Sequence, residues 1–315
     1  MAGVSAAWAP AGYEHPNYAA SLAEFGTPVW LPRSEAWVLR RAIPDSPHHD
    51  LMGPYPLFFC RDWSALPQDL QQLPDAARDA VSFAMVTDPF AQLTPEWLAA
   101  HFDLALPFKD HFVADLSRPL DDLVSKSHRA TVRRALRKVA VSRSPDPAAR
   151  LPEWVGLHRH LVRRHRIAGI RAFSAEAFAR QLGVPGMVLF EASEIATGEL
   201  VGMELWYVQG EIAYGHLAAF SDRGYALRAS YATKWEVLKY FSGRARYVHL
   251  SAAAGMNDED SDMDGLARFK RGWSSGTRKT YFCGKILDHA AYAALMRKRD
   301  AEAERFFPAY RRGEF

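Results

Sequence analysis

The sequence lacks most of the features that assign a chain to the simpler protein classes. Of its 315 residues, only Cys60 and Cys283 are cysteines, too few for a disulfide-rich secreted scaffold or a cysteine-rich metal site. No apolar run approaches the roughly 18 residues that a membrane-spanning helix needs. The N-terminus MAGVSAAWAPAGYEHP has no basic stretch followed by an apolar one, so it does not resemble a signal peptide. These absences predict a cytoplasmic protein without a membrane span.

Several catalytic and metal-binding motifs are also missing. Neither Gly-x-Ser-x-Gly nor the phosphate-loop lysine motif occurs, which argues against an esterase or a nucleotidase. His158, His160 and His165 do not have the His-x-x-x-His spacing of a helical metal site. We therefore predict no metal and no tightly bound cofactor.

The basic residues are unevenly distributed. The formal net charge is only +3, yet one run of basic side chains spans 118–143 and a second spans 155–171. Two neighbouring basic runs in a nearly neutral protein suggest a phosphorylated partner. The alternative is a pair of solvated helix faces balanced by acids elsewhere. The first run contains Arg118, Lys126, Arg129, Arg133, Arg134, Arg137, Lys138 and Arg143.

Short apolar runs separated by prolines predict strands in the first third of the chain. They cover 28–32, 36–41, 53–60 and 111–116. Thr94 and Pro95 predict a helix start. Apolar residues at helical spacing then predict a helix over 127–140.

Pro145, Pro147 and Pro152 suggest a linker, where we place a domain boundary. Beyond it we expect helices over 153–166 and 174–182, and a strand over 187–192. Turns at Gly198 and Gly210 then predict a three-stranded antiparallel meander that continues to 220. A loop over 221–228, a helix over 229–241 and a strand over 247–250 complete the pattern.

This order of elements resembles the GNAT acetyltransferase superfamily. In that fold the loop after the fourth strand and the next helix N-terminus hold the phosphates of acyl-CoA. The matching segment here is Asp222-Arg223-Gly224-Tyr225-Ala226-Leu227-Arg228-Ala229, which has fewer glycines than the usual pattern.

Three segments resemble the Fem-type aminoacyltransferases, which carry two GNAT-like domains. They are DHFVADL over 110–116, KSHRATVRRA over 126–135 and GLARFKRGW over 265–273. The resemblance implies an α/β (α+β) fold of two mostly antiparallel mixed sheets flanked by helices. We expect a degenerate N-terminal domain over 1–145 and a more complete acyltransferase domain over 146–288. A C-terminal helix over 289–315 is expected to pack back on the N-terminal domain.

The resemblance also implies the reaction. Such enzymes form an amide by transferring an acyl group from aminoacyl-tRNA or acyl-CoA to a primary amine, for example in a peptidoglycan precursor. Both donors carry several phosphates, which would explain the basic runs. A non-catalytic RNA- or nucleotide-binding module on a degenerate GNAT scaffold is the alternative.

Three residues are candidates for the chemistry of acyl transfer. Lys270, in the third Fem-like segment, would stabilise the oxyanion or a phosphate. His216, in a predicted strand, is a candidate general base because histidine titrates near neutrality. Glu204 interrupts an apolar strand and would hold the attacking amine. Each has a structural alternative: a solvated lysine, a core histidine or a buried carboxylate.

Further candidates would bind the two substrates. Guanidinium and ammonium groups suit phosphates, which makes Arg129, Arg133, Arg223, Arg228 and Lys234 the predicted donor-binding residues. Tyr231 and Asp264 are the predicted acceptor-binding residues; Asp264 belongs to an acidic loop that lacks the glycine spacing of a calcium-binding loop. Oligomeric state is not predicted.

Overall fold

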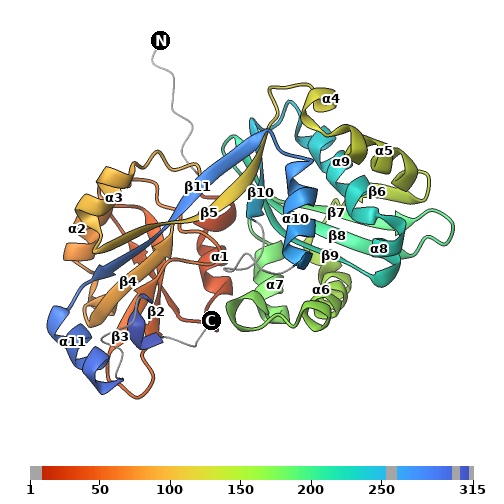
Figure 1. The fold of residues 1–315 in the computed structure, drawn as a ribbon. Helices are drawn as coiled ribbons and strands as arrows, with labels where there is room; N and C mark the ends of the chain where they lie inside the picture. Colours follow the sequence, from red (N-terminus) through yellow and green to blue (C-terminus); the bar gives the residue numbers. More distant parts are fainter. Residues whose placement is uncertain (1–8, 253–260, 300–305, 312–315) are drawn as a thin grey trace, which may run out of the picture.

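The computed structural model describes residues 9–252, 261–299 and 306–311, without the side chains of 261–264. Within these residues, eleven strands form one mixed sheet in the order β1-β2-β3-β4-β11-β5-β10-β9-β8-β7-β6. Helices lie on both faces of the sheet (Figure 1). The predicted α/β class is therefore confirmed. No helix in the described ranges has the length and apolar composition to cross a bilayer.

The C-terminal half contains the predicted meander. β7 (Met187–Glu194), β8 (Leu200–Gln209) and β9 (Ile212–Phe220) are consecutive antiparallel neighbours. Gly198 and Gly210 at the two turns have φ of +74° and +54°, a conformation that glycine adopts without a steric penalty. β6 (Val139–Arg143) extends the sheet beside β7, and β10 (Tyr247–Ala252) runs parallel to β9.

Helices bury opposite faces of this half of the sheet. α6 (Leu151–His165) and α7 (Ala175–Leu182) cover one face through Trp154 and Phe178. α5 (Lys126–Ala135), α9 (Ala229–Phe241) and α10 (Ser261–Arg271) cover the other, where Trp273 is fully buried. Each helix thus presents one apolar side to the sheet, as amphipathic spacing predicts.

The N-terminal half is smaller and built on the other end of the same sheet. Its strands are β1 (Thr27–Leu31), β2 (Ala36–Ala42), β3 (His49–Met52) and β4 (Ala80–Val86). Leu295 of the C-terminal helix packs on Ile43 and Val81. Its helices are α1 (Pro16–Ser21), α2 (Leu66–Gln71), α3 (Pro95–His101) and α11 (His289–Lys298), whereas α4 (Leu120–Leu123) lies beside α5 in the other half.

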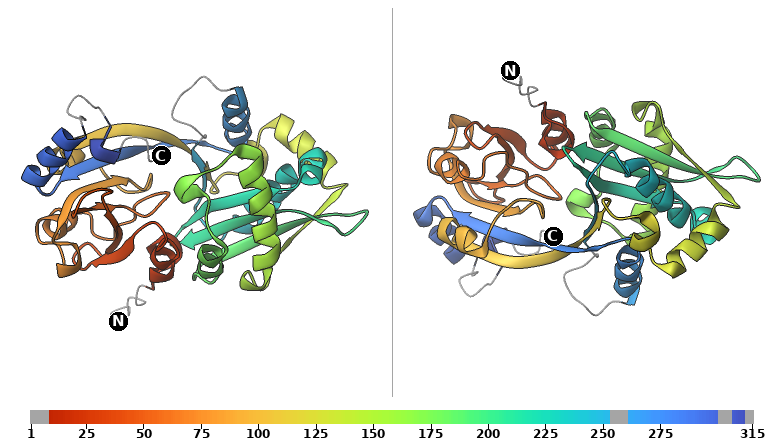
Figure 2. Two further views of the ribbon diagram at one scale, coloured as in Figure 1. Left: turned by 90° about the horizontal axis from the view of Figure 1, so that it is seen from below. Right: turned by 90° about the horizontal axis from the view of Figure 1, so that it is seen from above.

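Two long strands connect the halves. β5 (Leu104–Asp115) and β11 (Gly276–Ile286) pair with each other, while β11 also pairs with β4 and β5 with β10. Figure 2 shows both strands arching from one half to the other. The division at 145/146 stays a prediction; β6, which precedes it, pairs with β7, which follows it.

Three predicted elements differ from the structure. The segment 53–60 makes only isolated bridges, at Phe58 and Cys60, because Pro54 and Pro56 have no N–H for a ladder. The helix predicted over 127–140 ends at Ala135, and the β-branched Val139 begins β6. The loop predicted over 221–228 contains a short helix, α8 (Asp222–Leu227), which Ser221 caps by accepting from the Gly224 N–H.

Candidate functional site

The parallel pair β9–β10 separates into a fork at the centre of the sheet. Their pairing extends from Ile212 only to Tyr214, opposite His249. His216 is an extra residue opposite β8, a β-bulge, and bulges bend the strand that carries them. In β10, Ser251 has φ of +63° and the register against β5 shifts after His249. These irregularities turn the two strands apart.

Lys270 reaches this fork from the last turn of α10. Its Nζ donates a hydrogen bond to the carbonyl of Ala252, at the end of β10. Burial, and then the nearby charges of Lys234 and Lys109, lower the pKa of the Lys270 ammonium to about 7. A cationic group that is ready to lose its proton at neutral pH therefore lies where the strands diverge. Such perturbed groups are concentrated at functional sites.

Lys234 and Glu204 form an ion pair next to Lys270. The Lys234 Nζ lies 2.8 Å from Glu204 Oε2, and the two side chains are only 12% and 2% exposed. The ammonium also lies 4.4 Å from the centre of the Trp206 ring, a cation–π distance. The predicted phosphate-binding lysine and the predicted amine-binding carboxylate thus contact each other, and the charge of Lys234 also acts on the predicted catalytic lysine.

The second and third Fem-like segments contact each other through His128. The Nε2 of His128 donates to the carbonyl of Phe269 at 3.0 Å. The Ser125 N–H donates to the carbonyl of Gly272, also at 3.0 Å. Tyr231, a predicted acceptor-binding residue, packs its ring 5.0 Å from His128 and from Phe269. The two segments therefore form one packed junction beside the fork.

Gly272 is required for this junction. A Cβ at position 272 would lie 2.2 Å from the His128 ring, far inside van der Waals contact. We expect Gly272→Ala to lower the free energy of unfolding by about 1–3 kcal/mol, the usual loss on overpacking. Urea denaturation measures this. Gly265→Ala, within α10 before this turn, is the control, because nothing lies within 4 Å of its Cβ position; equal losses for both variants would contradict the proposed contact.

The predicted arginines do not converge on Lys270. Arg129 pairs with Asp121 at 2.9 Å, and Arg133 is exposed on α5. The Nε of Arg223 donates to Glu194 at 3.0 Å, and Arg228 is exposed at the left-handed position between α8 and α9. The side chain of Asp264 lies outside the described residues.

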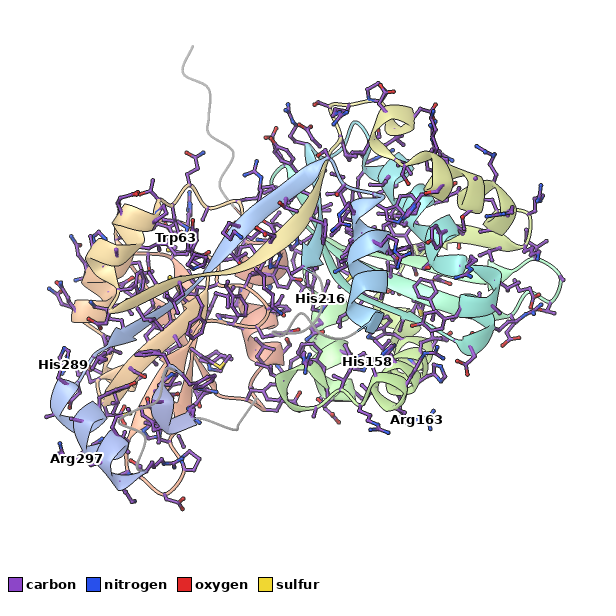
Figure 3. The ribbon with its side chains drawn as sticks, in the orientation of Figure 1. Trp63, His158, Arg163, His216, His289 and Arg297 are labelled. Atoms are coloured by element: carbon purple, nitrogen blue, oxygen red, sulfur yellow. The ribbon has the colours of Figure 1, made fainter. Side chains whose placement is uncertain are left out.

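His216 lies among aromatic side chains, with both ring nitrogens engaged. Its Nδ1 contacts the Tyr13 hydroxyl at 3.1 Å, and its Nε2 contacts Gln181 Oε1 at 3.1 Å. Burial lowers the pKa of His216 to about 3. Figure 3 shows this histidine close to α7. A neutral imidazole with no spare lone pair is a structural residue, which argues against its predicted role as a base.

Other titratable residues near the fork were not predicted. His249 of β10 hydrogen-bonds His111 of β5, and Tyr214 of β9 lies 5.2 Å from His249 between ring centres. The Tyr214 hydroxyl donates to Asp88 at 3.2 Å. Burial raises the pKa of Asp88 to about 7, against the lowering effect of hydrogen bonds from Phe90 and Tyr214. Nothing in the local sequence signals these contacts between distant residues.

Two surface hollows lie away from the fork. One, of about 530 Å³, is lined by residues such as Glu24, Arg40 and His49. The other, of about 850 Å³, lies beside Arg33 and His289. Among the described side chains, no group of three or more His, Cys, Asp or Glu residues could hold a metal.

Several solved structures share the fold of this chain at low sequence identity. FemX is 15% identical with a TM-score of 0.65, over 89% of this chain and 93% of that one. The C-terminal domain of a putative lysylphosphatidylglycerol synthetase from Agrobacterium fabrum is 14% identical with a TM-score of 0.61, over 91% and 90%. L-PGS from Bacillus licheniformis is 11% identical with a TM-score of 0.56, over 88% and 94%. No family model and no curated protein matches the sequence. These likenesses show a common fold.

Proposed function

Because the chain has the Fem-type GNAT fold, we propose that it is an N-acyltransferase. It forms an amide by transferring an activated acyl or aminoacyl group to a primary amine. The observation that carries this proposal is the position of Lys270. Its ammonium lies at the β9–β10 fork, close enough to Lys234 and Lys109 for their charges to lower its pKa.

The lysine arrangement suits the charge that develops during acyl transfer. Attack of an amine on an acyl carbonyl places negative charge first on the carbonyl oxygen and then on the leaving group. An ammonium has three N–H donors, and Lys270 directs one of them to Ala252. Among the described residues none engages the other two, which we assign to the oxyanion and the leaving group. An anion bound there would also raise the pKa of Lys270 and keep it charged.

The donor would be an aminoacyl-tRNA or an acyl-CoA. Arg133 and Arg134 are exposed on α5, which begins at the junction beside the fork, and Arg137 is exposed just beyond the end of this helix. A tRNA donor would use this wide basic surface, whereas acyl-CoA needs a compact phosphate site. The acceptor would be a primary amine of a peptidoglycan precursor or a small metabolite.

The exposed arginines of α5 also fit the second candidate function, a non-catalytic RNA- or nucleotide-binding module. Such a module would bind phosphates through Coulomb attraction without transferring an acyl group. Its binding would not depend on Lys270, because that residue lies in the fork rather than on the exposed face of α5.

Incubation with labelled aminoacyl-tRNAs and acyl-CoAs, in the presence of a panel of primary amines, tests the proposal. We expect label to enter an amide with one donor class. For a tRNA donor, Arg133→Glu/Arg134→Glu/Arg137→Glu should raise KM at least about tenfold and weaken its salt dependence; for acyl-CoA the same variant should leave KM nearly unchanged. Lys239→Glu, at an exposed position on α9, controls for general loss of positive charge. RNA binding without transfer would establish the second candidate instead.

A further inference from the structure

Two buried histidines from different strands share a hydrogen bond at the base of the fork. The Nδ1 of His111 lies 2.7 Å from the Nε2 of His249. The rings are inclined by 10° with centres 4.9 Å apart. They are 6% and 2% exposed. Imidazoles so completely removed from water require a specific reason, because they give up hydration at neutral pH.

The pair adjoins the Lys270 ammonium through the sheet register. Ala252, whose carbonyl accepts from Lys270, is the cross-strand partner of His111. His249 is the last residue of β10 that pairs with β9 before the strands diverge. The carbonyl that accepts from Lys270 and the two imidazoles therefore belong to adjacent stretches of β5 and β10, and the Lys270 charge acts on both histidines.

The hydrogen bond restricts the protonation of the pair. One ring must present an N–H and the other a lone pair. The Nδ1 of His249 is buried and makes no hydrogen bond to any described residue, while its ring is enclosed by Tyr214 and Phe90. His249 can accept from His111 through Nε2 when its own proton is on Nδ1. His111 then has its Nε2 lone pair available to another molecule.

We propose that the His111–His249 pair is the proton acceptor of the reaction; this inference rests on the proposed acyl transfer. The amine nitrogen forms its bond to the acyl carbon, and His111 Nε2 takes one of the amine protons. The bond from the acyl carbon to the donor oxygen or sulfur then breaks. That atom keeps the electron pair and receives a proton from Lys270. Exchange with solvent returns both groups to their starting states, so charge and atoms balance.

His249 stabilises the proton on His111. A protonated His111 donates through Nδ1 to His249 Nε2, and this hydrogen bond is stronger when the donor is charged. His111 is thus the catalytic residue, and His249 is a positioning residue that orients it. Tyr214 holds the His249 ring on one side and is itself fixed by Asp88.

The surrounding charges couple this base to donor binding. Burial, and then Lys270 and Lys109, lower the pKa of His111 to about 3, whereas Asp110 acts in the opposite direction. Burial, followed by His111 and Lys270, lowers the pKa of His249. A donor anion that neutralises the two lysines removes part of this effect and raises the basicity of His111. His111 is therefore a stronger base when the donor is bound, and it stays unprotonated when the donor is absent.

Kinetics of His111→Ala test the proposal. With the donor and acceptor identified as above, we expect kcat to fall by about 100-fold or more, the usual contribution of general base catalysis. The Kd of the donor should stay within about twofold, because the donor phosphates do not require the imidazole. Added imidazole should restore at least about tenfold of the lost rate, a recovery that a merely structural role would not give. His249→Phe should lower kcat by a smaller factor.

His158→Gln is the matched control. His158 is likewise buried, at 3% exposure, and its Nε2 is also without a partner among the described residues, but it belongs to α6 and packs on Trp154 and Phe178. It should retain the wild-type kcat. If His111→Ala keeps a third or more of kcat, or imidazole does not rescue it, the base is elsewhere and Asp88→Asn should show the larger loss. If the wild-type protein transfers no acyl group at all, the proposed function fails first.

Discussion

Replacement of Lys270 by methionine is expected to lower kcat/KM for acyl transfer by about 100- to 1000-fold. Methionine keeps the unbranched apolar stem but removes the ammonium that faces the developing oxyanion, and removal of one such donor has effects of this size. Donor consumption in the presence of the amine measures the loss. Because Lys270 is half-buried and its pKa is lowered, its removal should not lower the stability of the fold, and urea denaturation provides that control.

The pH dependence of kcat/KM shows whether Lys270 acts as a cation or as a base. The pKa of this group is lowered to about 7, so the ammonium is present below pH 7 and is lost above it. With an acceptor amine that is neutral throughout the range, kcat/KM should therefore fall as pH rises through about 7. Lys270→Arg keeps the charge at all these pH values and should abolish this fall while retaining part of the rate. A rise through pH 7 would instead identify Lys270 as a base.

Lys234→Met is expected to destabilise the protein by about 3–5 kcal/mol. This variant leaves the carboxylate of Glu204 buried without its partner, and an uncompensated buried charge has a cost of this order. Glu204 is 2% exposed and its oxygen lies 2.8 Å from the Lys234 ammonium. The free energy of unfolding from urea titration measures the effect.

Two further variants separate charge from packing at this pair. Lys234→Met/Glu204→Gln removes both charges and should recover much of the loss. Lys239→Met removes a lysine from the same helix whose partner Glu236 lies 3.0 Å away, with the lysine 51% exposed. That pair is on the surface, so the expected change is within about 1 kcal/mol. Equal losses for Lys234→Met and Lys239→Met would show that Glu204 is not buried as described.

Local patterns in the sequence predicted much of the C-terminal half. The meander was predictable because Gly198 and Gly210 separate runs of the right length, and both adopt φ values that other residues avoid. The Fem-type fold was predictable from three segments, and the structure brings the second and third of them into contact at His128. Lys270 lies in one of them, which is why a role for it was foreseeable.

The rest depends on contacts between distant parts of the chain. His111 and His249 are 138 residues apart, and Tyr214 and Asp88 are 126 apart. Their alignment follows from the order of strands in the sheet, which periodicity does not specify. For the same reason His216 looked as suitable a base as any other strand histidine. Only its neighbours Tyr13 and Gln181, each far from it in sequence, show that both of its nitrogens are occupied.

The two strands that cross the molecule make its halves mechanically inseparable. Because β5 and β11 contribute backbone hydrogen bonds at both ends, a rigid swing of one half away from the other would shear those ladders. Substrates therefore reach the fork without a hinge motion between the halves. A protease that cuts the chain within the exposed stretch 145–149 would not release either fragment. β5 lies before the cut and β11 after it, and the hydrogen bonds between these strands would hold the two fragments together.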